Sequence, residues 1–539
     1  VKEVINSYNK VLSKSPFLEI LSETPIKLSA EDETYIISFL KTELIKFFDD
    51  SIKLSLEDVD IKLILEDHFN LNLLFEKTKQ NEFKDAFVAQ IIKKYQKKNN
   101  EKIYIISKDD GFRKTFDNND QNFIIFENLS KFIEEIEKEA DGLIKDFVSE
   151  NQYGLEFDEI FLFHHFLDKF KQTIQQENYI GILEGDISEK TIEIGAPLGV
   201  ISVLLPAFPT FTLLVNIILL AMKSGNTMVV VTNKYTKKAT VEVFKRLVTL
   251  VEQSGYPEGG IGITETISDS SILELYNSEK VSLIVNIGCP EYINKQFKTT
   301  TPLIYGGEGS GPVFVERTAD IDKAIEDIIH SRSFDNGILP GSEQFLVTEN
   351  VIEQEIRDKL TCKGAYILNE TECEQLIEFL NRSKNNILCH YAGRSAKWLA
   401  KMAGFGVPDS TRVLVSLQDY INHEDFFNQK LLCPIIIVYL EPDWQMACKK
   451  CMSLLAEMKM GHTLTIHSKN WEVIKEFALV KEVGRMVVNS PTVCVATGVM
   501  SNLATSLILG GITTGRGYTS ENVTPKHWTY RRQVGFKVE

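Results

Sequence analysis

The sequence predicts an α/β fold built on parallel sheets, and two observations lead to this expectation. From about residue 190 onward, short apolar runs such as 227–232 (TMVVVT) and 281–288 (VSLIVNIG) have the length and composition of strands. Segments with helical periodicity, such as 210–225, separate these runs. Strands that alternate with helices form βαβ units, and such units bind ligands at the carboxyl ends of their strands.

The predicted strands fall into two sets, which indicates two α/β domains after the N-terminal part. The first set is expected at 198–206, 227–232, 260–264 and 281–288, and the second at 311–316, 343–349, 411–417, 433–441, 462–468 and 485–491. Residues 1–150 differ, because they are rich in Lys and Glu and mostly helical in pattern. Two short strands are expected there, at 102–107 and 122–127. We expect residues 151–190 to connect this part to the first α/β domain.

Composition, charge and the lack of long apolar runs limit the classes of protein to which the chain can belong. The chain has 539 residues, of which 43% are apolar and 25% charged, as in ordinary soluble globular proteins. No apolar run reaches the 18 residues of a membrane span, and the first 15 residues lack the apolar core of a signal peptide. The cysteines are read as reduced thiols, which predicts a cytoplasmic protein. The net charge of −16 gives no general attraction to nucleic acid, so RNA binding would need a local basic patch.

Several motifs in the larger part follow one another in the order of a known family. They are APLGVISVLLPAFPTFT (196–212), SRSFDNGILPGSEQ (331–344), GRSAKWLAKMAGFGVP (393–408), MGHTLTIHS (460–468), NSPT (489–492) and TSENVTPKH (519–527). They resemble the CoA-acylating aldehyde dehydrogenases, especially the N-terminal half of bacterial bifunctional aldehyde–alcohol dehydrogenases, over roughly residues 160–539. The resemblance implies an aldehyde dehydrogenase fold with a Rossmann-like cofactor domain (151–312), a catalytic-type α/β domain (313–510) and an oligomerisation segment (511–539). It also implies a homo-oligomer, since members of the group can assemble into helical filaments.

The residues that would carry the chemistry of this family are replaced. The family places its nucleophilic Cys after a Phe-Asp-Asn-Gly frame and two further residues, and here residues 334–339 are followed by Pro340. Proline has neither a nucleophilic atom nor a backbone N–H. The turn that carries the family's oxyanion-binding Asn reads Pro-Ala-Phe-Pro-Thr at 206–210, with Phe208 before the second proline. The carboxylate of the cofactor ribose contact is replaced by Gln429. Together these changes predict that the dehydrogenase activity is lost.

Other residues of the same part leave an alternative open. Cys289 follows a predicted strand at its carboxyl end, so it is the candidate for a substitute nucleophile, although a free Cys is more often a buried filler. His462 matches a family position near the active site, and without a nucleophile to serve it is read as a packed loop histidine. The run VVVTNKYTKKA lacks the Ser-Pro-His-Pro of the family, which leaves NAD binding in doubt, while Lys234, Lys237 and Lys238 could still meet a phosphate.

The N-terminal part carries paired acidic motifs. Asp85 opens an amphipathic helix, and Asp109 follows the strand predicted at 102–107. Carboxylates brought together in this way hold Mg²⁺ or Mn²⁺, and the bound ion lowers the pKa of water for attack on a phosphodiester. Asp85-Ala86 and the segment 107–112 resemble motifs of the PIN family of metal-dependent ribonucleases. The resemblance implies catalytic and metal-binding roles for Asp85 and Asp109, whereas a helix cap and a turn are their ordinary structural roles.

The PIN resemblance lacks one element, because no Asp-bearing first strand is found near residue 1. Either residues upstream of Val1 supply it or this half is degenerate as well. We favour the former, so the domain at 1–150 is predicted to be incomplete at its N-terminus. The lysines of 93–102 could meet RNA phosphates locally. Three hypotheses remain: an inactive aldehyde-dehydrogenase-like oligomeric scaffold fused to a PIN-like ribonuclease, in stress response or phage defence; an active CoA-acylating dehydrogenase with a non-standard nucleophile; or a purely structural filament protein.

Overall fold

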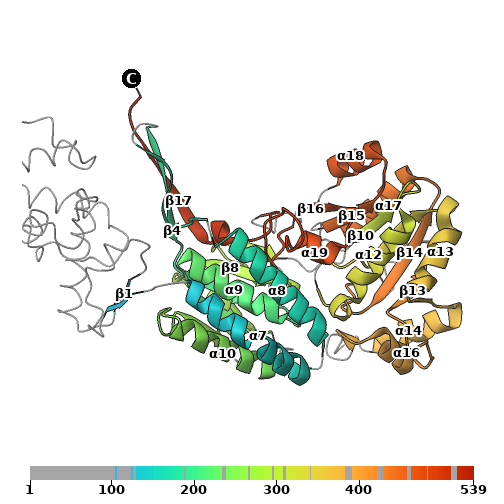
Figure 1. Cartoon of the computed structure of the whole chain (residues 1–539), viewed down its shortest axis with the longest axis horizontal. Helices are drawn as coiled ribbons and strands as arrows, with labels where there is room; N and C mark the ends of the chain where they lie inside the picture. Colours follow the sequence, from blue (N-terminus) through green and yellow to red (C-terminus); the bar gives the residue numbers. More distant parts are fainter. Residues whose placement is uncertain are drawn as a thin grey trace, which may run out of the picture. The chain divides into compact units, whose positions relative to one another are not determined.

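The computed structural model describes most of the chain from Leu129 onward and two short strands before it (Figure 1). The described residues are 103–105, 123–125, 129–151, 153–175, 177–186, 190–233, 238–264, 268–293, 296–306, 311–339, 341–382, 391–421, 427, 429–457, 463–481, 483–511 and 519–538. The chain forms two compact units, of which the larger holds residues 133–250 and 258–539. In the smaller unit, β1 (Ile103–Ile105) pairs in parallel with β2 (Phe123–Ile125), which confirms the two strands expected there.

A five-stranded parallel sheet forms the first α/β layer of the larger unit, in the order β7-β6-β5-β8-β9. Its strands are β5 (Val200–Leu204), β6 (Thr227–Val231), β7 (Ile261–Thr264), β8 (Val281–Ile287) and β9 (Leu303–Gly306), and its helices are α9 (Phe211–Ser224), α10 (Lys238–Gln253), α11 (Asp269–Tyr276) and η3 (Pro290–Ile293). Helix α9 is buried over almost its whole length, as its apolar sequence predicts. The Thr210 hydroxyl caps its start and Gly225, at φ 67°, ends it.

A seven-stranded parallel sheet forms the second α/β layer, in the order β12-β13-β14-β11-β10-β15-β16. Its strands are β10 (Pro312–Val315), β11 (Phe345–Glu349), β12 (Ala365–Ile367), β13 (Val413–Leu417), β14 (Ile435–Glu441), β15 (Thr463–His467) and β16 (Arg485–Val488). Its helices are α12 (Ile321–Ser333), η4 (Phe334–Gly337), η5 (Asn350–Ile352), α13 (Glu353–Cys362), α14 (Glu370–Arg382), α16 (Ala396–Ala403), α17 (Trp444–Glu457), α18 (Trp471–Val480) and α19 (Thr492–Ala496). The short helix η7 (Pro525–Trp528) packs on α9 of the first α/β layer instead.

Both faces of the seven-stranded sheet are covered by helices (Figure 1). In β14, Ile435 and Ile437 belong to the apolar cluster that includes residues of α14, α16, α17 and α18, whereas Ile436 and Val438 belong to the cluster with α12 and α13. Successive side chains of a strand point to opposite faces, so this sheet contributes to two cores at once. That is why its strands are nearly continuous apolar runs in the sequence.

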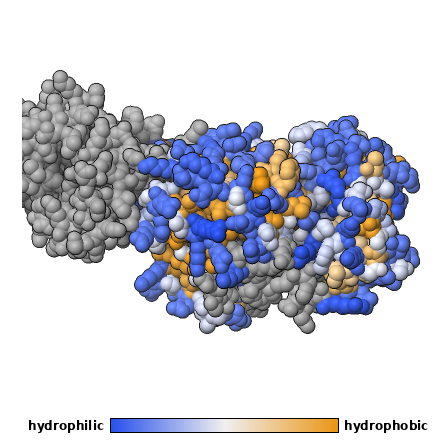
Figure 2. Space-filling view, turned by 60° about the horizontal axis from the view of Figure 1, so that its bottom comes forward, coloured by the Kyte–Doolittle hydropathy of each residue, from blue (hydrophilic) through white to orange (hydrophobic). Residues whose placement is uncertain are grey.

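A three-stranded antiparallel sheet completes the larger unit, in the order β17-β4-β3. It consists of β3 (Gly181–Asp186), β4 (Thr191–Pro197) and β17 (Thr529–Gly535). Figure 1 shows β4 and β17 as a long ribbon. Large apolar side chains of this sheet are exposed, among them Ile182 on β3 and Tyr530 on β17. Elsewhere the face shown in Figure 2 is mostly hydrophilic, with separate hydrophobic areas. Among the described residues, no helix is long and apolar enough to span a membrane.

Two helices precede the first α/β layer, and their positions differ from the domain organisation expected from the sequence. Helix α8 (Glu156–Gln172) lies within 151–190, the segment expected to connect two domains, and buries Leu162, Phe166 and Phe170. Helix α7 (Leu129–Asn151), which falls within the domain expected at 1–150 for most of its length, belongs from Ile133 onward to the larger unit. Its apolar side is buried there, and the Asn151 side chain accepts a hydrogen bond of 3.0 Å from the Thr240 hydroxyl of α10.

Candidate functional site

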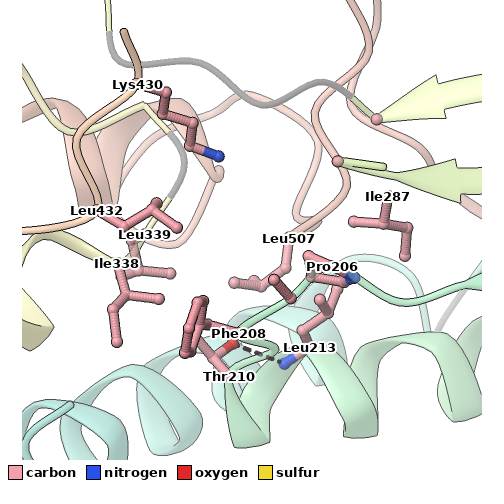
Figure 3. A pocket seen from close by; sticks show the side chains of 13 residues that line it. Pro206, Phe208, Thr210, Leu213, Ile287, Ile338, Leu339, Lys430, Leu432 and Leu507 are labelled. Carbon is pink, nitrogen blue, oxygen red and sulfur yellow. Dashed lines mark hydrogen bonds between the residues drawn. The ribbon is translucent and has the colours of Figure 1, made fainter. Parts of the chain in front are cut away.

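A small cavity in the larger unit lies where the carboxyl ends of β5 and β8 meet the segment after η4 (Figure 3). Its volume is about 50 Å³, which is room for a few water molecules. The lining is mostly apolar: Pro206, Ala207, Phe208, Leu213, Ile287, Ile338, Leu339, Leu432 and Leu507, together with Gly288, Gly306, Thr210 and Lys430. A parallel α/β fold binds ligands at this end of its strands, so the cavity is the candidate site.

The turn from β5 to α9 brings Phe208 into the cavity (Figure 3). The Phe208 ring packs edge to face on Tyr153, with ring centroids 5.1 Å apart. The Tyr153 hydroxyl donates a hydrogen bond of 3.1 Å to the Pro209 carbonyl oxygen, which ties the turn to the segment before α8. At this turn the chain therefore presents a fixed aromatic ring to the cavity.

The Phe-Asp-Asn-Gly frame at residues 334–337 forms a strained turn. Asp335 and Asn336, in η4, have φ angles of 50° and 51°, and Gly337 follows at 76°. The left-handed region is unfavourable for residues other than glycine unless the surroundings hold them there. The Asp335 N–H donates to the Asp158 carboxylate (2.7 Å), the Asp335 carboxylate accepts from the Leu155 N–H (2.7 Å), and the Asn336 amide donates to the Gly393 carbonyl oxygen (2.9 Å).

Three carboxyl groups are gathered beside this turn, two of them at the start of α8. Burial raises the pKa of Asp335 to about 7, against the hydrogen bond from Leu155, and the charge of Asp158 adds to the increase. Burial also raises the pKa of Glu159, and the charge of Asp335 raises it further. The Glu159 carboxylate accepts a hydrogen bond of 3.2 Å from the Phe211 N–H at the start of α9. These groups position the frame relative to the β5–α9 turn.

Lys430 and Leu432 form the other wall of the cavity. The Gln344 side chain donates to the carbonyl oxygens of Phe427 (2.9 Å) and Gln429 (2.8 Å) and accepts from the Leu431 N–H (2.9 Å). This clamp places the Lys430 side chain toward the cavity (Figure 3). Gln429, at the position of the family's carboxylate, is exposed and does not line the cavity.

The candidate substitute nucleophile, Cys289, faces the protein core. Its thiol lies 3.0 Å from the Leu205 carbonyl oxygen, and its N–H donates to the Asn286 side chain over 2.9 Å. Cys289 is buried in the apolar cluster that includes Tyr276 and Tyr292 and does not line the cavity. The arrangement matches that of a buried filler. None of the seven described cysteines lines the cavity.

The other residues singled out in the sequence have different outcomes. Asp85, Asp109, Pro340, His462, Lys234 and Lys237 lie outside the described residues. The described residues contain no group of three or more His, Cys, Asp or Glu side chains that could hold a metal ion. Sequence reasoning missed the contacts between the frame and α8, because no motif marks Asp158 or Glu159. It also overlooked a CxxC spacing, Cys448–Cys451, on α17.

Comparison with known proteins agrees with both family resemblances seen in the sequence. Residues 1–112 match the PIN domain family, and residues 125–365 match the aldehyde dehydrogenase family. The aldehyde–alcohol dehydrogenase of Clostridium acetobutylicum is 29% identical over 393 residues, which cover 72% of this chain and 44% of that protein. The chain thus spans less than half the length of this relative and of the Escherichia coli bifunctional enzyme.

Two solved structures resemble the chain in fold and sequence. A probable aldehyde dehydrogenase from Listeria monocytogenes has a TM-score of 0.72 at 29% identity, covering 76% of this chain and 91% of that one. An acetylating aldehyde dehydrogenase from Geobacillus thermoglucosidasius has a TM-score of 0.72 at 27% identity, with the same coverage. The larger part of the chain thus has the aldehyde dehydrogenase fold and is similar in sequence to aldehyde–alcohol and acetylating aldehyde dehydrogenases, and residues 1–112, which precede it, match the PIN domain family.

Proposed function

We propose that the chain is an aldehyde-dehydrogenase-like scaffold without dehydrogenase activity, which carries a PIN-type metal-dependent ribonuclease at its N-terminus. The observation that carries the first half is Phe208, whose fixed ring lines the candidate site beside Leu339 and Leu432. Acyl transfer to coenzyme A through a thioester needs a thiolate and a hydrogen-bond donor for the oxyanion. Pro340 and Phe208 stand where the family has these groups, and the thiol of Cys289 contacts the Leu205 carbonyl instead.

The match of residues 1–112 to the PIN family supports the nuclease half, because this segment includes both Asp85 and Asp109. Carboxylate oxygens are the ligands that Mg²⁺ and Mn²⁺ prefer. A divalent ion held by the two side chains would supply a water of lowered pKa for attack on an RNA phosphodiester. Asp85 and Asp109 would bind the ion, and lysines of 93–102 would contact the RNA backbone.

Self-association through the antiparallel sheet fits the same proposal. The side chains of β17 are mostly exposed, and Ile182 on β3 and Tyr530 on β17 present apolar surface there. We propose a cytoplasmic homo-oligomer or filament that holds the nuclease, in a role such as stress response or phage defence. If negatively stained protein forms polymers and assays detect neither ribonuclease nor dehydrogenase activity, the purely structural alternative is favoured.

The nuclease proposal is tested with labelled RNA and Mn²⁺. The full chain is expected to cleave the RNA. The double variant Asp85→Asn/Asp109→Asn is expected to cleave it at least tenfold more slowly, because the loss of one carboxylate charge at each position weakens the binding of the metal ion. Asp117→Asn, outside the paired motifs, is the matched control and keeps the wild-type rate. Equal cleavage by the wild type and the double variant would remove the nuclease from the proposal.

The loss of dehydrogenase activity is tested separately, by the oxidation of NADH with a panel of short acyl-CoA substrates. We expect no oxidation above the rate without protein, and no gain from Pro340→Cys alone, because Phe208 still occupies the position of the oxyanion donor. Pro340→Cys combined with Phe208→Asn is the informative comparison. NADH oxidation by the wild type that disappears in Cys289→Ser would establish the alternative enzyme.

A further inference from the structure

The CxxC pair of α17 lies beside a lysine at the end of α18. Cys448 and Cys451 belong to the apolar cluster on the α17 and α18 face of the seven-stranded sheet. Lys481 follows the last residue of α18, and its N–H closes that helix by donating to the Phe477 carbonyl oxygen. Only 8% of Cys448 and 7% of Lys481 is exposed. The pair is therefore held in place by the packing of two helices.

The two side chains are in direct contact. The Lys481 Nζ atom lies 2.7 Å from the Cys448 Sγ atom and 2.6 Å from the Cys448 carbonyl oxygen. The same Nζ atom lies 4.6 Å from the centroid of the Phe477 ring, where an ammonium is favoured by a cation–π interaction. Contacts with the Cys448 carbonyl oxygen and the Phe477 ring thus hold the Lys481 nitrogen against the Cys448 sulfur.

Contact with the Lys481 amine makes Cys448 the reactive member of the CxxC pair. The Lys481 Nζ atom lies 2.7 Å from the Cys448 sulfur, so a sulfur that is oxidised there already has a nitrogen nucleophile beside it. Cys451 is fully buried, and burial raises the pKa of its thiol to about 12, although the charge of Lys481 opposes the increase. Cys451 therefore stays a thiol.

We propose that Cys448 and Lys481 form a peroxide-sensitive modification site that closes a covalent sulfur–nitrogen cross-link. The Cys448 sulfur attacks hydrogen peroxide, the O–O bond breaks, and a sulfenic acid forms while the leaving hydroxide takes up the proton shared with Lys481 and departs as water. The Lys481 amine then attacks the sulfur, the S–N bond forms, the S–O bond breaks, and a second water leaves. One thiol, one amine and one peroxide give one sulfenamide and two waters, with sulfur oxidised by two electrons.

The geometry favours this outcome over a disulfide. Lys481 is already in contact with the sulfur that is oxidised, whereas Cys451 lies three residues along the same helix and is present as the less nucleophilic thiol. The cross-link would tie α17 to the end of α18 without moving either helix. It stands apart from the candidate site, because neither Cys448 nor Lys481 lines the cavity.

The test uses the full chain, treated with hydrogen peroxide, digested with trypsin and analysed by mass spectrometry with and without prior reduction. We expect a peptide pair joined through Cys448 and Lys481 that is two hydrogens lighter than the free peptides, together with loss of tryptic cleavage after Lys481. Cys451→Ser is expected to keep the cross-link. Lys481→Arg is expected to lose it and to leave a sulfenic acid at Cys448 that reacts with dimedone.

The exposed Cys362 is the internal control for oxidant, because it should be oxidised without joining a lysine. The proposal is overturned if Cys362 is oxidised while Cys448 stays reduced. It is equally overturned if the linked product is a disulfide between Cys448 and Cys451. Wild-type protein alone decides between these outcomes, so the result does not depend on the folding of any variant.

Discussion

Replacement of Arg332 by methionine is expected to lower the free energy of unfolding of the larger unit by about 2–5 kcal/mol. Arg332, at the end of α12, is fully buried. Its guanidinium donates to the carbonyl oxygens of Ile435 (2.9 Å) and Leu431 (2.6 Å) and to the Ser342 hydroxyl (3.0 Å). Methionine fills a similar volume but leaves these acceptors unpaired in the interior, and each unpaired acceptor costs about 1–3 kcal/mol.

Arg412→Met is the matched control for this effect. Arg412 is exposed, and its guanidinium donates one hydrogen bond of 2.9 Å to the Ser333 hydroxyl. Its replacement should change the free energy by about 0.5 kcal/mol at most. Urea unfolding followed by tryptophan fluorescence reports on the larger unit alone, because the tryptophans are Trp398, Trp444, Trp471 and Trp528. Equal losses in the two variants would contradict a specific role for the buried guanidinium.

The parallel sheets could be predicted from the sequence because both of their faces are buried. The strand predicted at 433–441 corresponds to β14 (Ile435–Glu441), and the strand predicted at 281–288 corresponds to β8 (Val281–Ile287). A strand that contributes to two cores is apolar at every position, so it stands out against amphipathic helices. Helix α9 is apolar for the same reason, since thirteen of its fourteen residues are buried.

The antiparallel sheet was missed for the opposite reason. In β17, the side chains after Thr529 are exposed, and the segment reads TYRRQVG, without a buried stripe. Its pairing partner β4 lies more than 300 residues earlier in the chain. Hydrogen bonds between distant strands leave no periodicity in either segment, so only the folded chain reveals them.

The candidate site could be located from the sequence but not built from it. The frame 334–337 and the turn 206–210 were recognised by their order, and both line or adjoin the cavity. The left-handed backbone of Asp335 and Asn336 depends on contacts with residues near 155–158, almost 180 residues away. No local pattern encodes a contact of that kind, and the burial of the Asp335 and Glu159 carboxyl groups runs against the usual exposure of such groups.

The buried carboxyl groups predict that the larger unit loses stability as the pH rises from about 4 to about 7. Asp335 and Glu343 each have a pKa of about 7 in the folded chain, raised mainly by burial, against ordinary values of 3.8 and 4.5. Between these values the folded state binds more protons than the unfolded state, so the free energy of unfolding falls with rising pH. At about 1.4 kcal/mol for each pKa unit, each group accounts for roughly 3–4 kcal/mol.

The double variant Asp335→Asn/Glu343→Gln should flatten this fall in urea unfolding curves measured at a series of pH values. Asn keeps an acceptor for the Leu155 N–H, and Gln keeps one for the Thr492 N–H, which lies 3.2 Å from the Glu343 carboxylate. Glu159 contributes in the same direction, so some slope remains. In the control Asp409→Asn, the slope between pH 4 and 7 should not change, because Lys397 lowers the pKa of that exposed carboxyl. Parallel curves for the wild type and the double variant would mean that both buried groups stay ionised in the folded chain, which their apolar surroundings oppose.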